Sequence, residues 1–182
     1  DEDLRANRQP EFTQIDVEMS FVEREDVFEI VEGLVKNVFQ IVDIDVPDEI
    51  PIMSYQRAIE EYGSDKPDLR FEMKLVDISS IVAESDFNIF SGTVKDGGQV
   101  KGIRLKGGAE FSRKQIDDYT DYVKEFGAKG LAWMALKEDE LKSPIAKFLS
   151  EKEVENIIEK MDAETGDLLL FVADKPKVVA NS

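Results

Sequence analysis

Apolar and polar side chains alternate along residues 11–21 and then recur at helical spacing along residues 25–42. In residues 11–21 one alternate set is mostly apolar, and the other is mostly polar, with Gln14, Asp16 and Glu18 in a row. This period of two predicts a strand with one face in a core and one polar face. The polar row is compatible with a ligand-binding surface and with the solvated face of an antiparallel sheet, and alternation alone favours the solvated face.

Two helices are predicted after this strand. Residues 25–42 carry the i, i+3, i+4, i+7 stripe of an amphipathic helix, formed by Val27, Ile30, Val31, Leu34, Val35, Val38, Phe39 and Val42. Ser54 is a suitable N-cap for a shorter helix that Gly63 ends, and its inward side chains are Ala58, Ile59 and Tyr62.

From residue 68 onward the pattern changes to shorter elements. It predicts a strand near 71–78, a short helix near 79–84 and a strand over 87–94. The run Asp96-Gly97-Gly98 then predicts a hairpin turn into a strand over 99–105. Neither this glycine pair nor Gly107-Gly108 has the spacing of a phosphate-binding loop, so we interpret both as turns.

Two capping boxes mark helix starts in the remaining sequence. Ser112 with Gln115 opens a helix with the predicted buried stripe Ile116, Tyr119, Val123 and Phe126, and Ser150 with Glu153 precedes Val154, Ile157, Ile158 and Met161. Strands are predicted over 131–137 and 168–173, and Ser143-Pro144 predicts a turn into a short buried helix. Hairpin-linked strands with interspersed helices indicate an α+β fold, an antiparallel sheet with helices.

The composition of the chain excludes several classes of catalytic and metal-binding site. The 182 residues carry a net charge of −17 and contain neither Cys nor His. Thiol nucleophiles, Ser-His-Asp triads, disulfide scaffolds and the usual zinc sites are therefore excluded. The acidic charge argues against a non-specific nucleic-acid coat, so any RNA contact must be local. No apolar run approaches the ~20 residues that cross a bilayer, and we expect a cytoplasmic protein with no membrane partner.

Residues 1–16, DEDLRANRQPEFTQID, closely resemble the second class II signature of bacterial-type aspartyl-tRNA synthetases. Four later segments resemble the same family in the same order: YGSDKPDLR at 62–70, GAKGLAW at 127–133, SPIAKFL at 143–149 and FVADK at 171–175. The resemblance implies a partial class II catalytic domain over 1–67, with a strand and helices, followed by a GAD-like insertion domain over 68–182. An accessory piece of an amidotransferase would not explain residues 1–16.

The resemblance implies a parent enzyme that activates aspartate with ATP and transfers it to aspartate tRNA. Matched residue by residue, Glu2 and Gln9 are implied at the ATP site and Asp16 at the ammonium group of aspartate, with Gln14 beside it. Arg5 and Arg8 are implied at the tRNA acceptor end, where guanidinium groups suit phosphates and base edges. The implied cofactors are ATP and magnesium, and the parent is implied to be a homodimer.

The family's signature arginine, third motif and anticodon-binding barrel have no counterpart in this sequence. We therefore expect an excised middle portion that catalyses nothing and binds no cofactor by itself, with an oligomeric state that the sequence leaves open. Without its neighbours in the parent, the strand over 11–21 should fray or pair between chains.

Four basic residues, Arg104, Lys106, Arg113 and Lys114, surround one strand-to-helix transition. The helix opened by Ser112 directs free N–H groups toward any nearby anion, so this transition is the best candidate for an RNA phosphate contact. Solvated surface charges are the alternative interpretation. Trp133 fits core packing better than base stacking. Two functions remain open at this point: a part of a tRNA ligase that contacts or gates tRNA, and a catalytically silent scaffold or interaction module.

Overall fold

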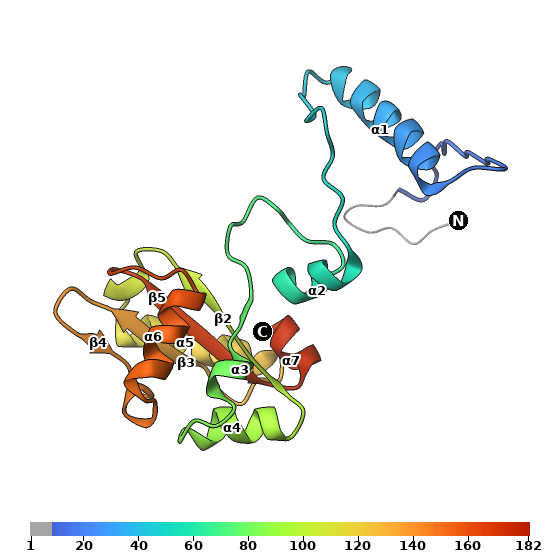
Figure 1. Cartoon of the computed structure of the whole chain (residues 1–182). Helices are drawn as coiled ribbons and strands as arrows, with labels where there is room; N and C mark the ends of the chain where they lie inside the picture. The colour runs from blue at the N-terminus through green and yellow to red at the C-terminus, as the bar shows by residue number, and fades with distance from the viewer. Residues whose placement is uncertain (1–8) are drawn as a thin grey trace. The chain divides into compact units, whose positions relative to one another are not determined.

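The computed structural model describes residues 9–182 and divides the chain into two compact units, one ending at Ile52 and the other running from Met53 to Ser182 (Figure 1). The first unit contains helix α1 (Arg24–Gln40). The helix begins where the Asp26 carboxylate accepts a hydrogen bond from the backbone N–H of Glu23 at 2.8 Å, and two acidic residues in its first turn complement the helix dipole. The predicted helix is confirmed, but none of its residues is buried.

The strand predicted over 11–21 is absent, because these residues are irregular and almost all exposed. A helix closes its own backbone hydrogen bonds, whereas a strand needs a partner. No segment of the described first unit pairs with residues 11–21. Residues 11–21 therefore have the sequence pattern of a strand but form no strand, because no described segment of the first unit pairs with them.

The second unit contains all the strands of the described chain. Its elements are α2 (Tyr55–Tyr62), β1 (Val76–Asp77), α3 (Ser79–Val82), α4 (Asn88–Lys95), β2 (Gln99–Leu105), η1 (Gly108–Glu110), α5 (Arg113–Glu125), β3 (Ala132–Leu136), β4 (Leu141–Lys142), η2 (Ala146–Phe148), α6 (Glu151–Lys160), β5 (Leu168–Asp174) and α7 (Pro176–Asn181). The five strands form one antiparallel sheet in the order β1-β2-β5-β3-β4. The predicted α+β class is confirmed.

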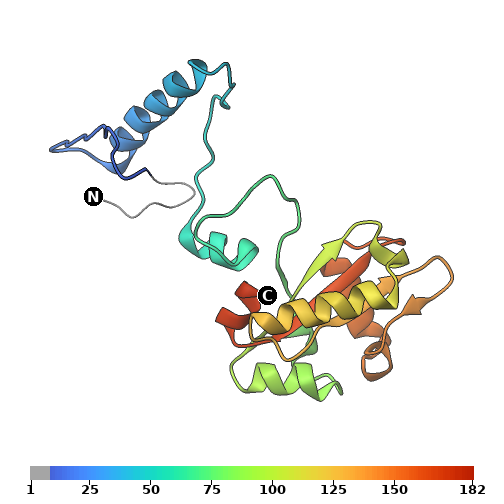
Figure 2. The same cartoon turned by 180° about the vertical axis from the view of Figure 1, so that it is seen from behind.

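Helices cover both faces of this sheet. On one face α3, α4 and α6 pack over the larger core, which includes Phe90, Ile157 and Phe171. On the other face α5 and α7 pack over two smaller clusters, which include Ile116 and Val179 (Figure 2). Alternate residues of β5 supply both faces: Leu169 and Phe171 point to the larger core, and Leu168 and Leu170 point to the α5 side. The last strand in the sequence therefore lies at the centre of the sheet.

The strand predicted over 87–94 is wrong, because this segment is helix α4. Phe87, Phe90 and Val94 recur at helical spacing and pack in the larger core, whereas Ile89 is exposed. Gly97, with a φ of 77°, follows the helix and turns the chain into β2. The turn is confirmed, but it joins a helix to a strand and is not a hairpin.

The capping boxes at Ser112 and Ser150 are confirmed, since each hydroxyl accepts the backbone N–H three residues later. The buried stripe predicted for α5 is wrong in part, because Tyr119 and Phe126 are each 41% exposed. The strand predicted near 71–78 is reduced to Val76–Asp77. The helix predicted after Ser143-Pro144 is the single turn η2.

Helix α2 belongs to the second unit, although the sequence placed the domain boundary after residue 67. Three contacts hold its C-terminal end. The ammonium group of Lys101 donates to the carbonyl of Glu60 at 3.0 Å, and the backbone N–H of Leu75 donates to the carbonyl of Glu61 at 2.8 Å. Gly63 lies so close to α7 that an added Cβ would be 2.5 Å from the carbonyl oxygen of Ala180.

Candidate functional site

The residues implied at the ATP and aspartate sites are only partly described. Glu2, Arg5 and Arg8 lie outside the described residues, and Gln9, Gln14 and Asp16 are exposed on the irregular segment before α1. Within residues 9–182, no three acidic side chains are grouped so that they could hold a metal ion.

The four basic residues predicted at an RNA contact have different surroundings. Arg104 extends from β2 on the face of the sheet that carries α6, and its side chain is only 12% exposed. Its Nε donates to the Asp167 carboxylate at 2.6 Å, and its other nitrogens contact the carboxylates of Asp162 and Glu164 at 3.0 and 3.7 Å. The guanidinium group is thus already bound by acidic groups of its own chain.

Asp167 connects this cluster to the backbone. Its carboxylate is 6% exposed and accepts the backbone N–H of Glu164 at 2.9 Å and that of Gly107 at 3.0 Å, besides the guanidinium of Arg104. Burial alone would raise the pKa of Asp167, but the two backbone N–H groups and Arg104 outweigh it, and the pKa is lowered. The Arg104–Asp167 pair therefore fixes the loops at this end of the sheet.

Lys106, Arg113 and Lys114 are exposed. Lys106 lies 3.7 Å from the Glu72 carboxylate, and the Nε of Arg113 donates to Asp117 at 3.0 Å. The Arg113 guanidinium also lies 5.7 Å from the centre of the Trp133 ring. Trp133 itself is buried, as predicted for a core residue. Lys106 and Arg113 thus have exposed acidic partners, and Lys114 has none among the described residues, whereas the Arg104 guanidinium is largely buried against Asp167.

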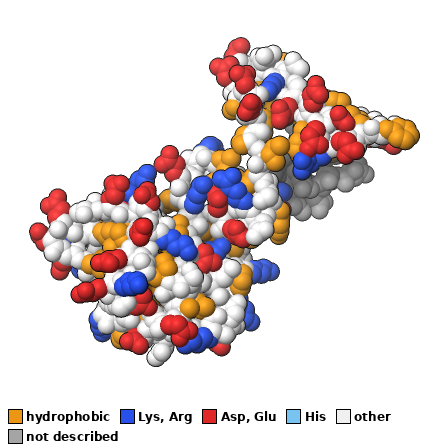
Figure 3. All heavy atoms as spheres, in the orientation of Figure 1, with side chains coloured by type: hydrophobic (Ala, Val, Ile, Leu, Met, Phe, Trp, Pro, Cys, Tyr) orange, Lys and Arg blue, Asp and Glu red, His pale blue; other side chains and the backbone are white. Residues whose placement is uncertain are grey.

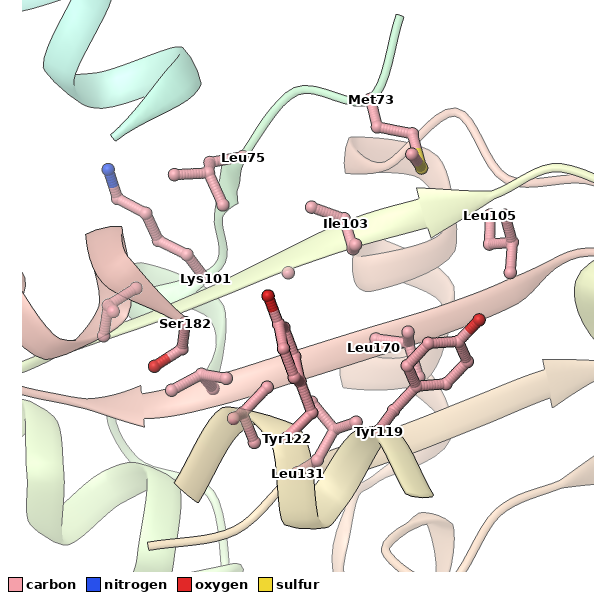
Figure 4. Close-up of a pocket in the computed structure, with 14 residues that line it drawn as sticks. Met73, Leu75, Lys101, Ile103, Leu105, Tyr119, Tyr122, Leu131, Leu170 and Ser182 are labelled. Atoms are coloured by element: carbon pink, nitrogen blue, oxygen red, sulfur yellow. The ribbon is translucent and has the colours of Figure 1, made fainter. Parts of the chain in front are cut away.

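Sequence reasoning missed a hollow on the α5 side of the sheet, which we call the apolar groove. It has a volume of about 260 Å³. Figure 4 shows Ile103 and Leu105 of β2 and Leu170 of β5 on its floor, with Tyr119 and Tyr122 of α5 on one side and Met73 and Leu75 on the other. The sequence signal was the pair of tyrosines at i and i+3 on α5, of which only Tyr119 was assigned to the predicted buried stripe.

Charges of both signs are interspersed on the face of the second unit seen in Figure 3. Lys and Arg side chains there lie among Asp and Glu side chains and form no continuous basic surface. A broad electrostatic attraction for nucleic acid is therefore not a property of this face. Among residues 9–182, none of the helices combines the length and apolar character that a membrane span requires.

Comparison with known proteins gives two kinds of match. The GAD domain family matches residues 90–182, from α4 to the end of α7. An aspartate–tRNA(Asp/Asn) ligase of Halothermothrix orenii is 70% identical over 182 residues, which are all of this chain and 31% of that protein. A ligase of the same name from Natranaerobius thermophilus is 56% identical over 183 residues, and an aspartate–tRNA ligase of Clostridium perfringens is 57% identical over 180 residues. The chain spans about 30% of the length of these relatives.

Proposed function

Since this chain belongs to the GAD domain family, and since aspartate–tRNA ligases match it from end to end, we propose that it is a section of such a ligase. The observation that carries the proposal is the identity of 70% along the whole chain, which includes residues 9–52 outside the GAD domain match. The parent enzyme would join aspartate to aspartate tRNA with consumption of ATP.

In this proposal the two units have separate roles. Residues of the first unit contribute to the aminoacylation site, where Asp16 would hold the ammonium group of aspartate by a charge-assisted bond and Gln14 would lie beside it. Gln9 and Glu2 would contact the nucleotide, and Arg5 and Arg8 the tRNA acceptor end. The chain alone should be inactive, because it spans only 31% of the length of the ligase that it matches.

A hybrid enzyme tests this assignment. The 182 residues replace the corresponding segment of the Halothermothrix orenii ligase, and aspartylation of aspartate tRNA is measured beside the isolated chain. We expect activity of the hybrid, none of the isolated chain, and a loss of at least ~100-fold in the hybrid with Asp16→Asn, because the substrate ammonium then loses its charged partner. The matched control is Asp45→Asn, which makes the same change at another exposed position. An inactive, folded hybrid would contradict the proposal, and full activity of the Asp16 variant would contradict the role of that residue.

For the second unit we propose a local tRNA contact through Lys106, Arg113 and Lys114. The support is their exposure beside the start of α5, where free backbone N–H groups and basic side chains together suit a phosphate. The alternative is a scaffold without RNA contact, which the net charge of −17 favours.

Fluorescence anisotropy with aspartate tRNA and a non-cognate tRNA at two salt concentrations separates these functions. Changing the three residues to Ala should weaken binding and lower the slope against log salt by about one per lost phosphate contact. The control changes Lys142, Lys152 and Lys160 to Ala, which removes the same charge from other exposed positions. Equal effects of both triple variants would indicate net charge alone, and absence of binding would favour the scaffold.

A further inference from the structure

Strand β2 has a partly open edge. Its ladder with β5 covers seven residue pairs, from Gln99 to Leu105. On the other side, in the described chain, its ladder with β1 consists of two pairs, Val76 with Gly102 and Asp77 with Lys101. The half of β2 from Ile103 to Leu105 therefore lacks a paired strand on one side. Such an edge presents backbone groups that another strand can use.

The segment just before β1 has the sequence of a strand. Leu69, Phe71, Met73 and Leu75 alternate with the charged residues Arg70, Glu72 and Lys74. The segment is nevertheless irregular, and the side chains of Leu69, Phe71 and Met73 are 50%, 60% and 46% exposed. Its apolar face is thus left in solvent next to an edge that could accept it.

Two observations show that this segment already follows β2 in a defined register. Continuing the β1–β2 register backward pairs Leu75 with Ile103, Met73 with Leu105, and Glu72 with Lys106. The Glu72 and Lys106 side chains are in fact 3.7 Å apart. All four apolar members of these pairs line the apolar groove, where Figure 4 shows Leu75 near Ile103 and Met73 toward the Leu105 end of β2.

The alternation of hydrogen-bonded and non-hydrogen-bonded residue pairs along the β1–β2 ladder also agrees with this register. The backbone N–H of Ile78 donates to the carbonyl of Val100 at 2.9 Å, so hydrogen-bonded pairs recur at every second residue, and Lys74 would form one with Arg104. The N–H of Leu75 then points away from β2, and it does donate to the carbonyl of Glu61. Extending the ladder would therefore leave that attachment to α2 intact.

The register places two basic side chains opposite each other, which is unfavourable for like charges. Both already have acidic partners. Lys74 lies 2.9 Å from the Glu61 carboxylate, and Arg104 is bound by Asp167. The repulsion between Lys74 and Arg104 is thereby offset.

From this geometry we propose that residues 71–75 form a strap that closes on the open edge of β2. In the closed state the strap extends β1, and Met73 moves over the apolar groove beside Leu105. The strap thus forms one wall of the apolar groove, and its position sets the width of the groove. This device is independent of the proposed ligase activity.

A disulfide trap tests the register in the full 182-residue chain, which contains no Cys of its own. Met73→Cys with Leu105→Cys creates a non-hydrogen-bonded pair, whose Cα separation of about 4.5 Å in a closed ladder suits a disulfide. The control, Glu72→Cys with Leu105→Cys, places the two thiols on opposite faces. We expect the first pair to form an intramolecular disulfide roughly tenfold faster than the control under mild oxidation.

Other outcomes overturn the proposal. Equal rates for both pairs would mean that the segment has no register, and disulfide-linked dimers would mean that the edge pairs with a second copy of the chain.

Hydrogen exchange on the unmodified chain provides a measurement without substitution. The amides of Glu72 and Lys74 should exchange more slowly than that of Met73, because only the first two face β2 in the closed state. Uniformly fast exchange over 71–75 would also overturn the strap.

Discussion

Replacing Asp167 by Asn should destabilise the second unit by about 3 kcal/mol. The wild-type carboxylate is almost fully buried and accepts three hydrogen bonds, two of them from backbone N–H groups and one from Arg104. An Asn side chain has one acceptor oxygen, so its NH₂ group must face at least one of these donors. The variant also leaves the largely buried guanidinium group without its closest counter-charge.

The magnitude follows from these losses. A hydrogen bond to a charged group contributes about 1.5–3 kcal/mol, and a buried donor left without a partner costs about 1–3 kcal/mol. Their combination agrees with the lower end of the ~3–5 kcal/mol found when one partner of a buried ion pair is removed. Glu164→Gln is the matched control, because that carboxylate also lies near Arg104, at 3.7 Å, but is 77% exposed. It should cost less than about 1 kcal/mol.

Urea unfolding followed by the fluorescence of Trp133, the single tryptophan and a buried one, measures both variants. The pH dependence gives a second check. The pKa of Asp167 is lowered in the folded chain, so its contribution is fully present above the unfolded Asp pKa of about 3.9. The contribution is lost as the pH falls through the folded pKa. The stability difference between wild type and the Asn variant should therefore shrink in acid. A loss below about 1 kcal/mol at neutral pH, or one equal to that of the control, would refute this reasoning.

Three further predictions use the same unfolding assay or hydrogen exchange. Gly63→Ala should lower the free energy of unfolding by more than ~1 kcal/mol, because φ at this position is 69° and the new Cβ meets the α7 backbone. The control Gly92→Ala lies in open space within α4 and should raise the free energy of unfolding by about 0.5–1 kcal/mol. Equal effects of the two substitutions would contradict the close approach of Gly63 to α7. Lys101→Met should speed amide exchange in α2 by removing the ammonium bond to Glu60, and unchanged exchange would show that this bond does not hold the helix. Ser112→Ala should cost about 1 kcal/mol through loss of the N-cap, and a negligible change in the unfolding midpoint would contradict that role.

Local signals predicted much of the second unit. The capping boxes at Ser112 and Ser150 were found because a hydroxyl and an acceptor three residues later satisfy backbone groups without help from the rest of the chain. Segments rich in β-branched and aromatic residues were harder to assign to a helix or a strand. Residues 87–94 have strand-like composition, but their helical spacing of Phe87, Phe90 and Val94 places these side chains in the larger core.

Features that depend on distant parts of the chain could not be predicted in this way. The alternation over 11–21 is real, but a strand forms only where a partner edge exists. The Arg104–Asp167 pair joins residues far apart in the sequence, so Arg104 looked like a free basic residue. The apolar groove likewise arises only when α5 is placed over β2 and β5.

The central place of β5 determines when the sheet can form during synthesis. Strands β2 and β3 both pair with β5, and they do not pair with each other. A nascent chain that has delivered β2 must therefore wait for β5, roughly 3–14 s at about 5–20 residues per second. During that interval only β1 with β2 and β3 with β4 can pair, and the edges of β2 and β3 that bind β5 in the finished sheet have no partner. A nascent chain whose β5 has not yet emerged from the ribosome would therefore be prone to aggregation, whereas emergence of the seven residues of β5 allows the two halves to join.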